Sequence, residues 1–575
     1  MSDSDNIEKI SYVEQGEPTR GSVEKISSSR WKNFKDSFKP ADMTRYDTMG
    51  LTDVQKAALA TADAPLARKL KSRHLQMIAI GGSIGTGLFV GSGKVLSTGG
   101  PAALLIGFGM IGAMLFCTVQ ALGELAVTFP VSGAFAVYSS RFIDPSWGFA
   151  MGWNYGMQWM TVLPVELVAA SITIDFWHSN VNHAAWIAIF YVLILVINIF
   201  GVRGYGEAEF IFSIIKVVAV LGFIILGIIL DCGGGPQGGY IGGRYWHNPG
   251  AFANGFKGVC SVFVTAAFSF TGTELVGLAA AETDNPRKTL PSAVKQVFWR
   301  ITLFYIVSLT LVGLLVPYND PNLLSPSNVG AAASPFVIAI RNAGIKVLPS
   351  ILNVVVIIAV LSVGNSSVYG CSRTFASLAA QGLAPRWLGY IDRSGRPLAG
   401  IAVCLIFGLL SFVVASPKEN EVFNWLMALS GLSIVFTWGS ICLCHIRFRR
   451  AMKLQGRSLD ELPFLSQAGV IGSWFGFVFN CLILVAQFWV ALYPVGGAKP
   501  NASTFFQSYL AAPVVIVFYL VFKIWKKSTF VHTRDIDLDT GRRTVDIDAL
   551  REEIREERAY IRSRNIFYRV YKFWC

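Results

Sequence analysis

The sequence predicts an all-α polytopic membrane protein with twelve membrane-spanning helices. Of its 575 residues, 53% are hydrophobic and only 15% are charged, and the mean hydropathy is +0.50. Soluble domains average about 25% charged residues. The apolar residues form long blocks, and about 20 such residues cross a bilayer as a helix. Twelve blocks of this kind are centred near residues 85, 115, 162, 192, 218, 268, 307, 362, 406, 434, 481 and 514.

The distribution of positive charge predicts the orientation of the chain. A formal net charge of +13 would suggest a nucleic-acid partner in a soluble protein. Here, however, alternate loops hold about 13 Lys and Arg, including Arg287, Arg393 and Arg449, and the remaining loops hold about six. Because positive residues stay in cytoplasmic loops, both termini are expected in the cytoplasm, and no nucleic-acid partner is expected.

Composition divides the chain into three regions. Residues 1–73 are polar and are expected to form a largely disordered cytoplasmic tail. Residues 74–526 form the twelve-helix domain. Residues 527–575 form a second cytoplasmic tail, with a short amphipathic helix expected over about 546–563. The cysteine spacings fit no metal site, and no nucleophile–base pair appears, so neither a metal nor an enzyme is expected.

The first span is unusually rich in glycine. It carries Ile80-Gly81-Gly82-Ser83-Ile84-Gly85-Thr86-Gly87-Leu88. Each interior glycine costs a helix about 1 kcal/mol relative to alanine, so this density predicts a break in mid-membrane. Non-helical backbone at that depth must line a cavity or be buried in protein. A small-residue face for close helix packing is the alternative.

The sixth span has a matching interruption, Phe268-Ser269-Phe270-Thr271-Gly272-Thr273-Glu274. Two breaks five helices apart indicate an inverted five-plus-five repeat with the substrate between them. The second half of span 1 begins at its break, so the N–H groups of 85–88 suit a carboxylate. The first half of span 6 ends at its break, so the carbonyls of 268–271 suit an ammonium group. An α-amino acid carries both groups.

These motifs, with Ala281-Glu282-Thr283-Asp284-Asn285-Pro286-Arg287-Lys288, resemble the fungal amino-acid permeases of the amino acid–polyamine–organocation superfamily. The chain is most similar to the general amino-acid permeases, from about Arg73 to Lys527 and again at Phe573-Trp574-Cys575. The resemblance implies a LeuT-type fold with helices 1 and 6 broken. It also implies proton-coupled import of L-amino acids across the plasma membrane by alternating access, with broad specificity and no cofactor besides protons. Amino acids and membrane lipids are the expected partners.

The predicted substrate site combines both breaks with residues from span 8. Its members are Ser83, Ile84, Gly85, Thr86, Gly87, Phe268, Ser269, Phe270, Thr271, Ser362 and Val363. Ser362 and Val363 match pocket positions of the family, and ordinary small-residue packing is their alternative. Phe268 is the aromatic side chain expected to act as a gate.

Two ionisable residues inside the spans are the candidates for proton coupling, because such groups are rare in membranes and usually functional. Lys216 in span 5 matches a lysine of proton-coupled relatives, which replaces a sodium ion between spans 1, 5 and 8. The alternative is that Lys216 extends to the cytoplasmic surface. Glu274 lies beside the break of span 6, with a structural hydrogen bond as its alternative. Glu166 is expected to be either buried in the site or a brace between helices, and Glu124 to be structural.

The tails suggest regulation. Lys9 and Lys25 resemble the ubiquitin acceptors of the family, which implies a ubiquitin ligase as partner, and Cys575 resembles its palmitoylated cysteine. The alternative function is a sensor that binds amino acids without transporting them. The alternative architecture is a twelve-span sugar-type carrier, which does not explain breaks in spans 1 and 6.

Overall fold

The computed structural model is helical. It describes residues 34–41, 55, 56, 59, 61, 66, 70, 72–237, 239–283, 285–324, 334–415, 419–497, 499–542, 552, 555, 556 and 559–569. Over these residues no strand forms, and the only β-type pairings are isolated bridges between Pro40 and Asp392 and between Leu70 and Thr283.

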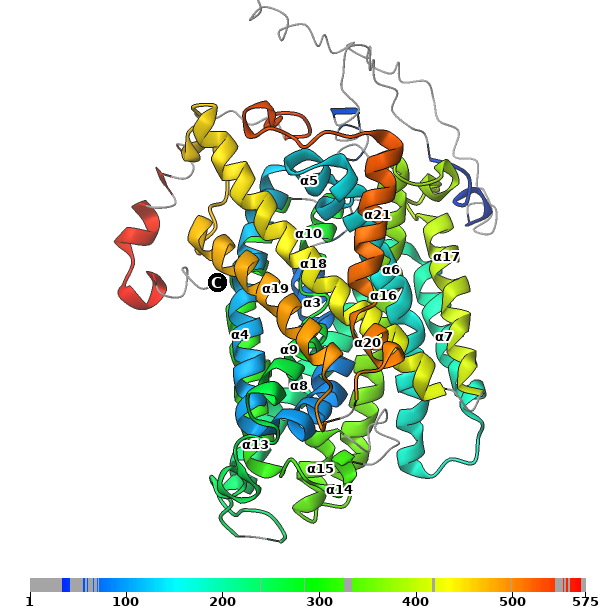
Figure 1. Cartoon of the computed structure of the whole chain (residues 1–575), viewed down its shortest axis with the longest axis vertical. Helices are drawn as coiled ribbons and strands as arrows, with labels where there is room; N and C mark the ends of the chain where they lie inside the picture. The colour runs from blue at the N-terminus through cyan, green and yellow to red at the C-terminus, as the bar shows by residue number, and fades with distance from the viewer. Residues whose placement is uncertain are drawn as a thin grey trace, which may run out of the picture.

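Six long helices make up most of the bundle (Figure 1). They are α4 (Ser92–Thr128), α6 (Pro145–Thr173), α8 (Gly201–Asp231), α16 (Leu348–Ala380), α18 (Glu419–Leu454) and α19 (Gly469–Leu492). The shorter α-helices are α3 (Ser72–Gly81), α5 (Ala134–Phe142), α7 (His183–Ile199), α9 (Gly255–Ser269), α10 (Leu275–Ala279), α11 (Pro286–Lys295), α12 (Val297–Arg300), α13 (Ser308–Leu315), α14 (Pro321–Leu324), α15 (Pro335–Asn342), α17 (Leu398–Gly408), α20 (Ala502–Tyr509) and α21 (Ala511–Lys526).

Segments of 3₁₀ and π geometry link or extend these helices. They are η1 (Gly87–Gly91), η2 (Ile174–Trp177), η3 (Trp246–Gly250), η4 (Ala280–Glu282), η5 (Ile301–Val307), η7 (Arg386–Gly389), η8 (Leu409–Ala415), η9 (Leu459–Glu461) and η10 (Thr533–Asp535).

The helices confirm a polytopic membrane protein. Within the described ranges, seven are long and apolar enough to cross a bilayer, or eight if α20 and α21, which meet at 69°, form one span. Three shorter apolar helices cover 183–199, 255–269 and 398–413. The helix from η1 through α4 also bends at Gly100, where φ is +84°, next to Pro101. The predicted count of twelve therefore stays a prediction.

Large apolar side chains cover the outside of the bundle. Examples are Ile189, Val218, Ile225, Ile406 and Ile524, which are 55%, 64%, 63%, 67% and 75% exposed. Exposing so much apolar surface to water is unfavourable by about 25 cal/mol per Å². Hydrocarbon removes this penalty, so this outer surface suits the interior of a bilayer.

The centre of the bundle is built on α6 and α16, which pack along each other (Figure 1). Helix α3 packs on α8, and α9 packs on α4. One end of the bundle carries α5 together with residues 34–41 and 528–542, and we call it the tail end. Helices α14 and α15 lie at the opposite end (Figure 1).

Local sequence sets where the central helices begin. Asp144 caps α6 by accepting a hydrogen bond from the Ser146 N–H at 2.8 Å, and Pro145 occupies the first turn, where a missing N–H is harmless. Asn182 caps α7 in the same way, through the Ala184 N–H at 2.9 Å.

Residues 528–542 form a strap across the tail end. The guanidinium of Arg141 on α5 donates to the Asp537 carbonyl at 2.7 Å and lies 3.3 Å from the Asp537 carboxylate. Ile536 and Leu538 are buried on either side, and Gln455, which directly follows α18, donates to the Ile536 carbonyl at 2.7 Å. The strap therefore joins α5 to α18. The predicted amphipathic helix at about 546–563 lies largely outside the described residues.

Neutralising Asp537 is expected to loosen this strap. Burial alone would raise the pKa of Asp537, but the charge of Arg141 and the backbone N–H groups of Thr540 and Asp539 outweigh burial and lower it. The ion pair is therefore complete above the ordinary aspartate value of about 3.9 and is lost as the pH falls through the lowered pKa. Asp537→Asn removes about 1 kcal/mol of this attraction. We expect amide hydrogen exchange at 536–540 to rise about fivefold at neutral pH.

The control is Asp535→Asn, an exposed position two residues away. Equal exchange in both variants would contradict the role of the ion pair.

Candidate functional site

The first span is broken where the glycines cluster. Helix α3 ends at Gly81, residues 82–85 lie outside any helix, and the chain resumes helical geometry at Thr86 and η1. The sixth span is broken as well, because α9 ends at Ser269 and α10 starts at Leu275. Both breaks fall where the sequence predicts them.

The two breaks touch each other through backbone. A Cβ placed on Gly272, whose φ is +101°, would lie 2.4 Å from the Gly82 carbonyl oxygen. A Cβ on Gly87 would lie 2.2 Å from the Ser269 Cα. No side chain fits at these distances. The glycines thus serve both purposes considered from the sequence, since the helix is broken and its small residues also pack closely.

A tyrosine from the seventh apolar segment ties the breaks together. The Tyr305 hydroxyl lies 2.5 Å from the Ser83 carbonyl oxygen and 2.8 Å from the Ser269 carbonyl oxygen, and shares its proton between them. The side chain is 1% exposed. Sequence reasoning missed Tyr305, because a lone aromatic in an apolar run gives no signal of a polar role.

Several backbone groups predicted to face a substrate are already bonded within the chain. The Leu88 N–H donates to the Gly85 carbonyl at 3.1 Å, so the prediction that it is a free donor is wrong. The Phe268 carbonyl accepts from the Thr271 N–H at 3.1 Å, and the Phe270 carbonyl accepts from the Thr273 hydroxyl at 2.9 Å. A carbonyl oxygen has two lone pairs, and the Phe270 carbonyl uses both, because it also accepts from the Thr273 N–H at 3.3 Å.

The side chain of Lys216, on α8, reaches the C-terminal end of α3. Its ammonium donates to the Gly81 carbonyl at 2.6 Å and to the Ser362 hydroxyl at 2.7 Å, so it joins α3, α8 and α16. The C-terminal end of a helix carries a partial negative charge, which favours a cation there. Its side chain is fully buried, so the alternative that it extends to the surface is wrong.

Glu209 completes this contact, and sequence reasoning missed it. It accepts from the Ser362 hydroxyl at 2.7 Å and from the Asn365 amide at 3.3 Å, and it is fully buried. The available signal was its spacing, because seven residues are two helical turns and place Glu209 on the same face of α8 as Lys216. We name Lys216, Glu209, Ser362 and the Gly81 carbonyl the lysine cluster. Ser362 thus contacts charged groups, and Val363 packs against Gly85.

Two further carboxylates lie at the breaks. Glu166 of α6 accepts a hydrogen bond from the Thr86 hydroxyl, and its second oxygen is buried without a hydrogen-bond partner in the structure. Glu274 accepts from the Tyr155 hydroxyl at 3.2 Å and from the Gly272 N–H at 3.2 Å. The Thr271 hydroxyl is also buried without such a partner. The breaks therefore hold polar atoms able to accept or donate further hydrogen bonds.

The remaining predicted residues divide into two groups. Ser83, Ile84, Phe268, Ser269 and Phe270 are all buried, at 5%, 0%, 7%, 2% and 1% exposure. Phe268 lies against Gly431 of α18. Lys9, Lys25 and Cys575 lie outside the described residues.

Glu124 takes a structural position, as the sequence predicts. Its carboxylate contacts Arg449 at 2.5 Å and His445 at 3.0 Å, and it accepts from the Ser466 N–H at 2.8 Å. These contacts tie α4 to α18 and to the segment before α19.

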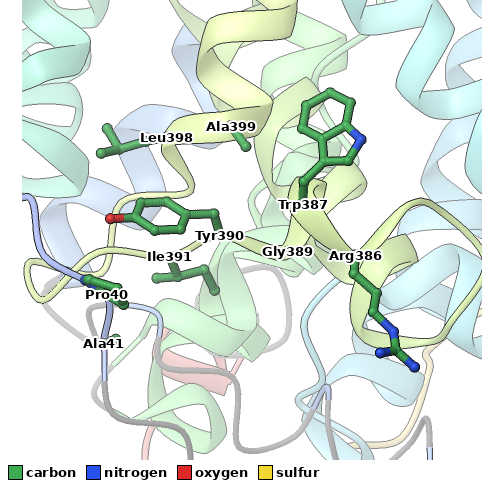
Figure 2. Close-up of a pocket in the computed structure, with 9 residues that line it drawn as sticks. All are labelled: Pro40, Ala41, Arg386, Trp387, Gly389, Tyr390, Ile391, Leu398 and Ala399. Carbon is green, nitrogen blue, oxygen red and sulfur yellow. The ribbon is translucent and has the colours of Figure 1, made fainter.

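A pocket of about 620 Å³ lies elsewhere, at the tail end. Figure 2 shows Tyr390 and Ile391 next to Pro40, with the Arg386 guanidinium directed away from them. It is lined by Pro40, Ala41, Arg386, Trp387, Gly389, Tyr390, Ile391, Leu398 and Ala399. It shares no residue with the predicted substrate site, whose chemistry lies at the breaks. Within the described parts of the chain, no three His, Cys, Asp or Glu residues gather as metal ligands would.

Known proteins share this chain's sequence over most of its length. The amino acid permease family matches residues 74–534. The general amino-acid permease GAP2 of Candida albicans is 63% identical over 94% of this chain and 93% of the relative. The general amino-acid permease GAP1 of Saccharomyces cerevisiae is 58% identical over 97% and 94%.

A solved structure shares the fold at much lower identity. A point mutant of the manganese transporter of Eremococcus coleocola superposes with a TM-score of 0.50 at 14% identity. The superposition covers 85% of this chain and 98% of that protein. The likeness concerns the arrangement of helices alone.

Adding one methyl group at the contact between the breaks is expected to destabilise the protein. Gly272→Ala puts a side chain at a positive φ and against the Gly82 carbonyl, which costs about 2–3 kcal/mol. We expect the midpoint of thermal unfolding of the purified protein to fall clearly. Unfolding is measured with a thiol-reactive dye or by intrinsic fluorescence. The control is Gly222→Ala in α8, where an added Cβ meets nothing within 4 Å. If both variants melt like the wild type, the breaks do not depend on this contact.

Proposed function

The chain belongs to the amino acid permease family, and from that premise we propose that it imports amino acids together with protons. Its relatives are permeases rather than enzymes, so transport of amino acids across a membrane is the activity that the family carries. Proton coupling, the direction of transport and the substrate range belong to the proposal.

One observation carries the proposal. A buried ammonium, that of Lys216, bonds the last carbonyl of α3 directly before the break. A buried lysine, unlike an arginine, can release its proton and take it up again when it becomes hydrated. A proton taken up or released there changes the attraction that holds α3 to α8 and α16.

The amino acid binds at the two breaks. Its carboxylate faces the N–H groups of 85–87, at the N-terminal end of the second half of span 1. Its ammonium group faces the carbonyls of 268–271, with the Glu166 oxygen and the Thr271 hydroxyl as further partners for its polar groups. The backbone supplies most of these contacts, which recognise the part shared by all α-amino acids.

Broad specificity follows from the same arrangement. The side-chain end of the site, around Ile84, Phe268 and Val363, is apolar and carries no charge that selects acidic or basic side chains. The two relatives reported above are both named general amino-acid permeases, which supports this reading.

The proposed architecture is twelve spans in a five-plus-five inverted repeat of the LeuT type. Two breaks, contacting each other at the centre of the bundle, support it. The proposed location is the plasma membrane with both termini in the cytoplasm, and the excess of Lys and Arg in alternate loops supports this orientation.

Uptake of labelled amino acids into permease-deficient yeast tests coupling. Lys216→Met keeps the length of the side chain and removes its charge. A charge-assisted hydrogen bond contributes about 1.5–3 kcal/mol, so we expect uptake to fall about ten- to hundredfold. Wild-type accumulation should rise at acid external pH and collapse with a protonophore.

The control is Lys257→Met, which alters a partly buried lysine on α9 that bonds the Pro494 carbonyl at 3.1 Å, away from the cluster. Surface expression is compared in parallel. Accumulation indifferent to pH and protonophore would leave import standing and remove proton coupling. Binding or signalling without accumulation would make the protein a sensor.

Regulation through the tails is a separate part of the proposal. We expect Lys9 and Lys25 to accept ubiquitin and Cys575 to carry palmitate, as in the family the sequence resembles. A Lys9→Arg/Lys25→Arg variant should stay at the cell surface after nitrogen is supplied, and Cys575→Ser should lose a lipid label. Normal internalisation of the first variant, or a retained label in the second, would contradict the corresponding role.

A further inference from the structure

A buried ion pair between Arg373 and Glu282 lies in the bundle, apart from the lysine cluster. The Arg373 guanidinium of α16 bonds the Glu282 carboxylate of η4 at 2.8 Å, and the two side chains are 5% and 1% exposed. The Tyr369 hydroxyl also donates to Glu282, at 3.3 Å. We call Glu282, Arg373 and Tyr369 the arginine clamp.

Aromatic and backbone contacts seal the space around the clamp. The Arg373 guanidinium lies 3.9 Å from the Tyr369 ring centre, and that ring stacks on Tyr205 of α8 at 4.3 Å and 8°. The Glu282 carbonyl accepts from the Leu70 N–H at 3.2 Å, directly before α3. Leu70, Tyr205 and Tyr369 are 0%, 1% and 0% exposed. The layer is closed to solvent.

The clamp lies between the substrate site and the tail end. Arg373 follows Ser362 by eleven residues on α16, and Tyr205 precedes Lys216 by eleven on α8. At 1.5 Å per residue, each separation is about 16 Å. Both separations run toward the tail end. Residues 390–396 follow α16 and contact residues 34–41 there, and Gly201, at the start of α8, contacts Arg396.

The clamp also joins two different groups of helices. Glu282 ends the second half of the broken sixth span, and Leu70 leads into the first half of the broken first span. Tyr205 lies on α8, and Tyr369 and Arg373 lie on α16. In alternating access the broken helices move against the rest of the bundle. Such a movement separates Glu282 from Arg373.

We propose that the Glu282–Arg373 pair is the gate between the substrate site and the tail end, which the proposed orientation makes the cytoplasmic side. The inference rests on the proposed transport function. Opening parts the two charges and hydrates both of them. The pair holds the closed state, and water restores the solvation that burial removes once the gate is open, so the closed state is not permanent.

A pair that only stabilises the fold would make the same contacts as a gate. The test therefore measures from which side of the membrane a reagent reaches the interior of the bundle. Ser366 lies on α16 between the lysine cluster and the clamp, is fully buried, and contacts the Tyr205 hydroxyl at 3.1 Å. A Ser366→Cys chain reports access to this level. The measurement is labelling of this cysteine by a membrane-impermeant thiol reagent in sealed vesicles. Vesicles of each orientation are used, and labelling of the protein that keeps Ser366 is subtracted as background.

The test variant is Glu282→Gln/Arg373→Gln, which removes both charges and leaves no lone buried charge. Neutral partners bond only about half as strongly as charged ones, so we expect labelling of Ser366→Cys from the tail-end side to rise at least about tenfold, with little change from the opposite side. The matched control is Asp392→Asn/Arg396→Gln. That pair is equally buried, at 0% and 5%, but lies within one loop, so labelling should stay at the parental level.

The outcomes separate the gate from the transport function. Parental labelling in the double variant, with uptake intact, overturns the gate and leaves transport standing. Increased tail-end labelling in a protein that never accumulates amino acids supports the gate and overturns the transport function. An equal rise from both sides, or a rise in the control, makes the pair a brace and overturns the gate. If the double variant fails to fold, Glu282→Asp shortens the acid while keeping its charge, and unchanged labelling there also overturns the proposal.

Discussion

The direct contact of backbone with backbone at the centre of the bundle is the constraint on which the rest of the structure depends. Gly272 meets Gly82, and Gly87 meets Ser269, at distances that exclude any side chain. Because the helices are interrupted where they touch, each break exposes backbone polar groups in a region where hydrocarbon offers no partner. Those groups must be satisfied by other parts of the protein or by a ligand. The break thus creates the requirement for a polar site, and the site needs no charged side chain to be polar.

The neighbouring helices supply hydrogen-bond partners at two levels along the bundle, one at the breaks and one at the arginine clamp. Tyr305 supplies a hydroxyl to both breaks, Glu166 reaches Thr86, and Lys216 bonds the carbonyl that ends α3. About 16 Å further along α8 and α16, the arginine clamp closes the same interhelical space with a buried ion pair. In both layers the buried charges lie where broken helices meet continuous ones, and the surface that faces lipid remains apolar.

The sequence predicted the features that leave a local trace. Glycine density revealed both breaks, and a lysine in an apolar run revealed Lys216, since each is anomalous against its own neighbours. The missed residues have no such trace. Tyr305 looks like an ordinary core aromatic, and Glu209 was not singled out although it shares a helical face with Lys216. Leu88 was expected to donate to a ligand, but its N–H closes a turn onto Gly85. These roles depend on contacts between segments far apart in the chain, which no spacing rule reports.

The layered arrangement links protonation to movement under the proposed cycle. Lys216 and Glu209 lie on α8, while the Gly81 carbonyl belongs to the broken first span. While Lys216 is charged, its bond to Gly81 is charge-assisted and holds the first half of that span against α8. A neutral amine keeps the geometry but loses about half of that strength. Release of the proton therefore weakens the attachment of the same segment that Leu70 links to Glu282 in the clamp. Linkage requires the converse as well, so in the proposed cycle opening the clamp favours release of the proton. In the proposed cycle, one ammonium group and the half-helix that it holds are enough to make proton release and opening at the tail end favour each other.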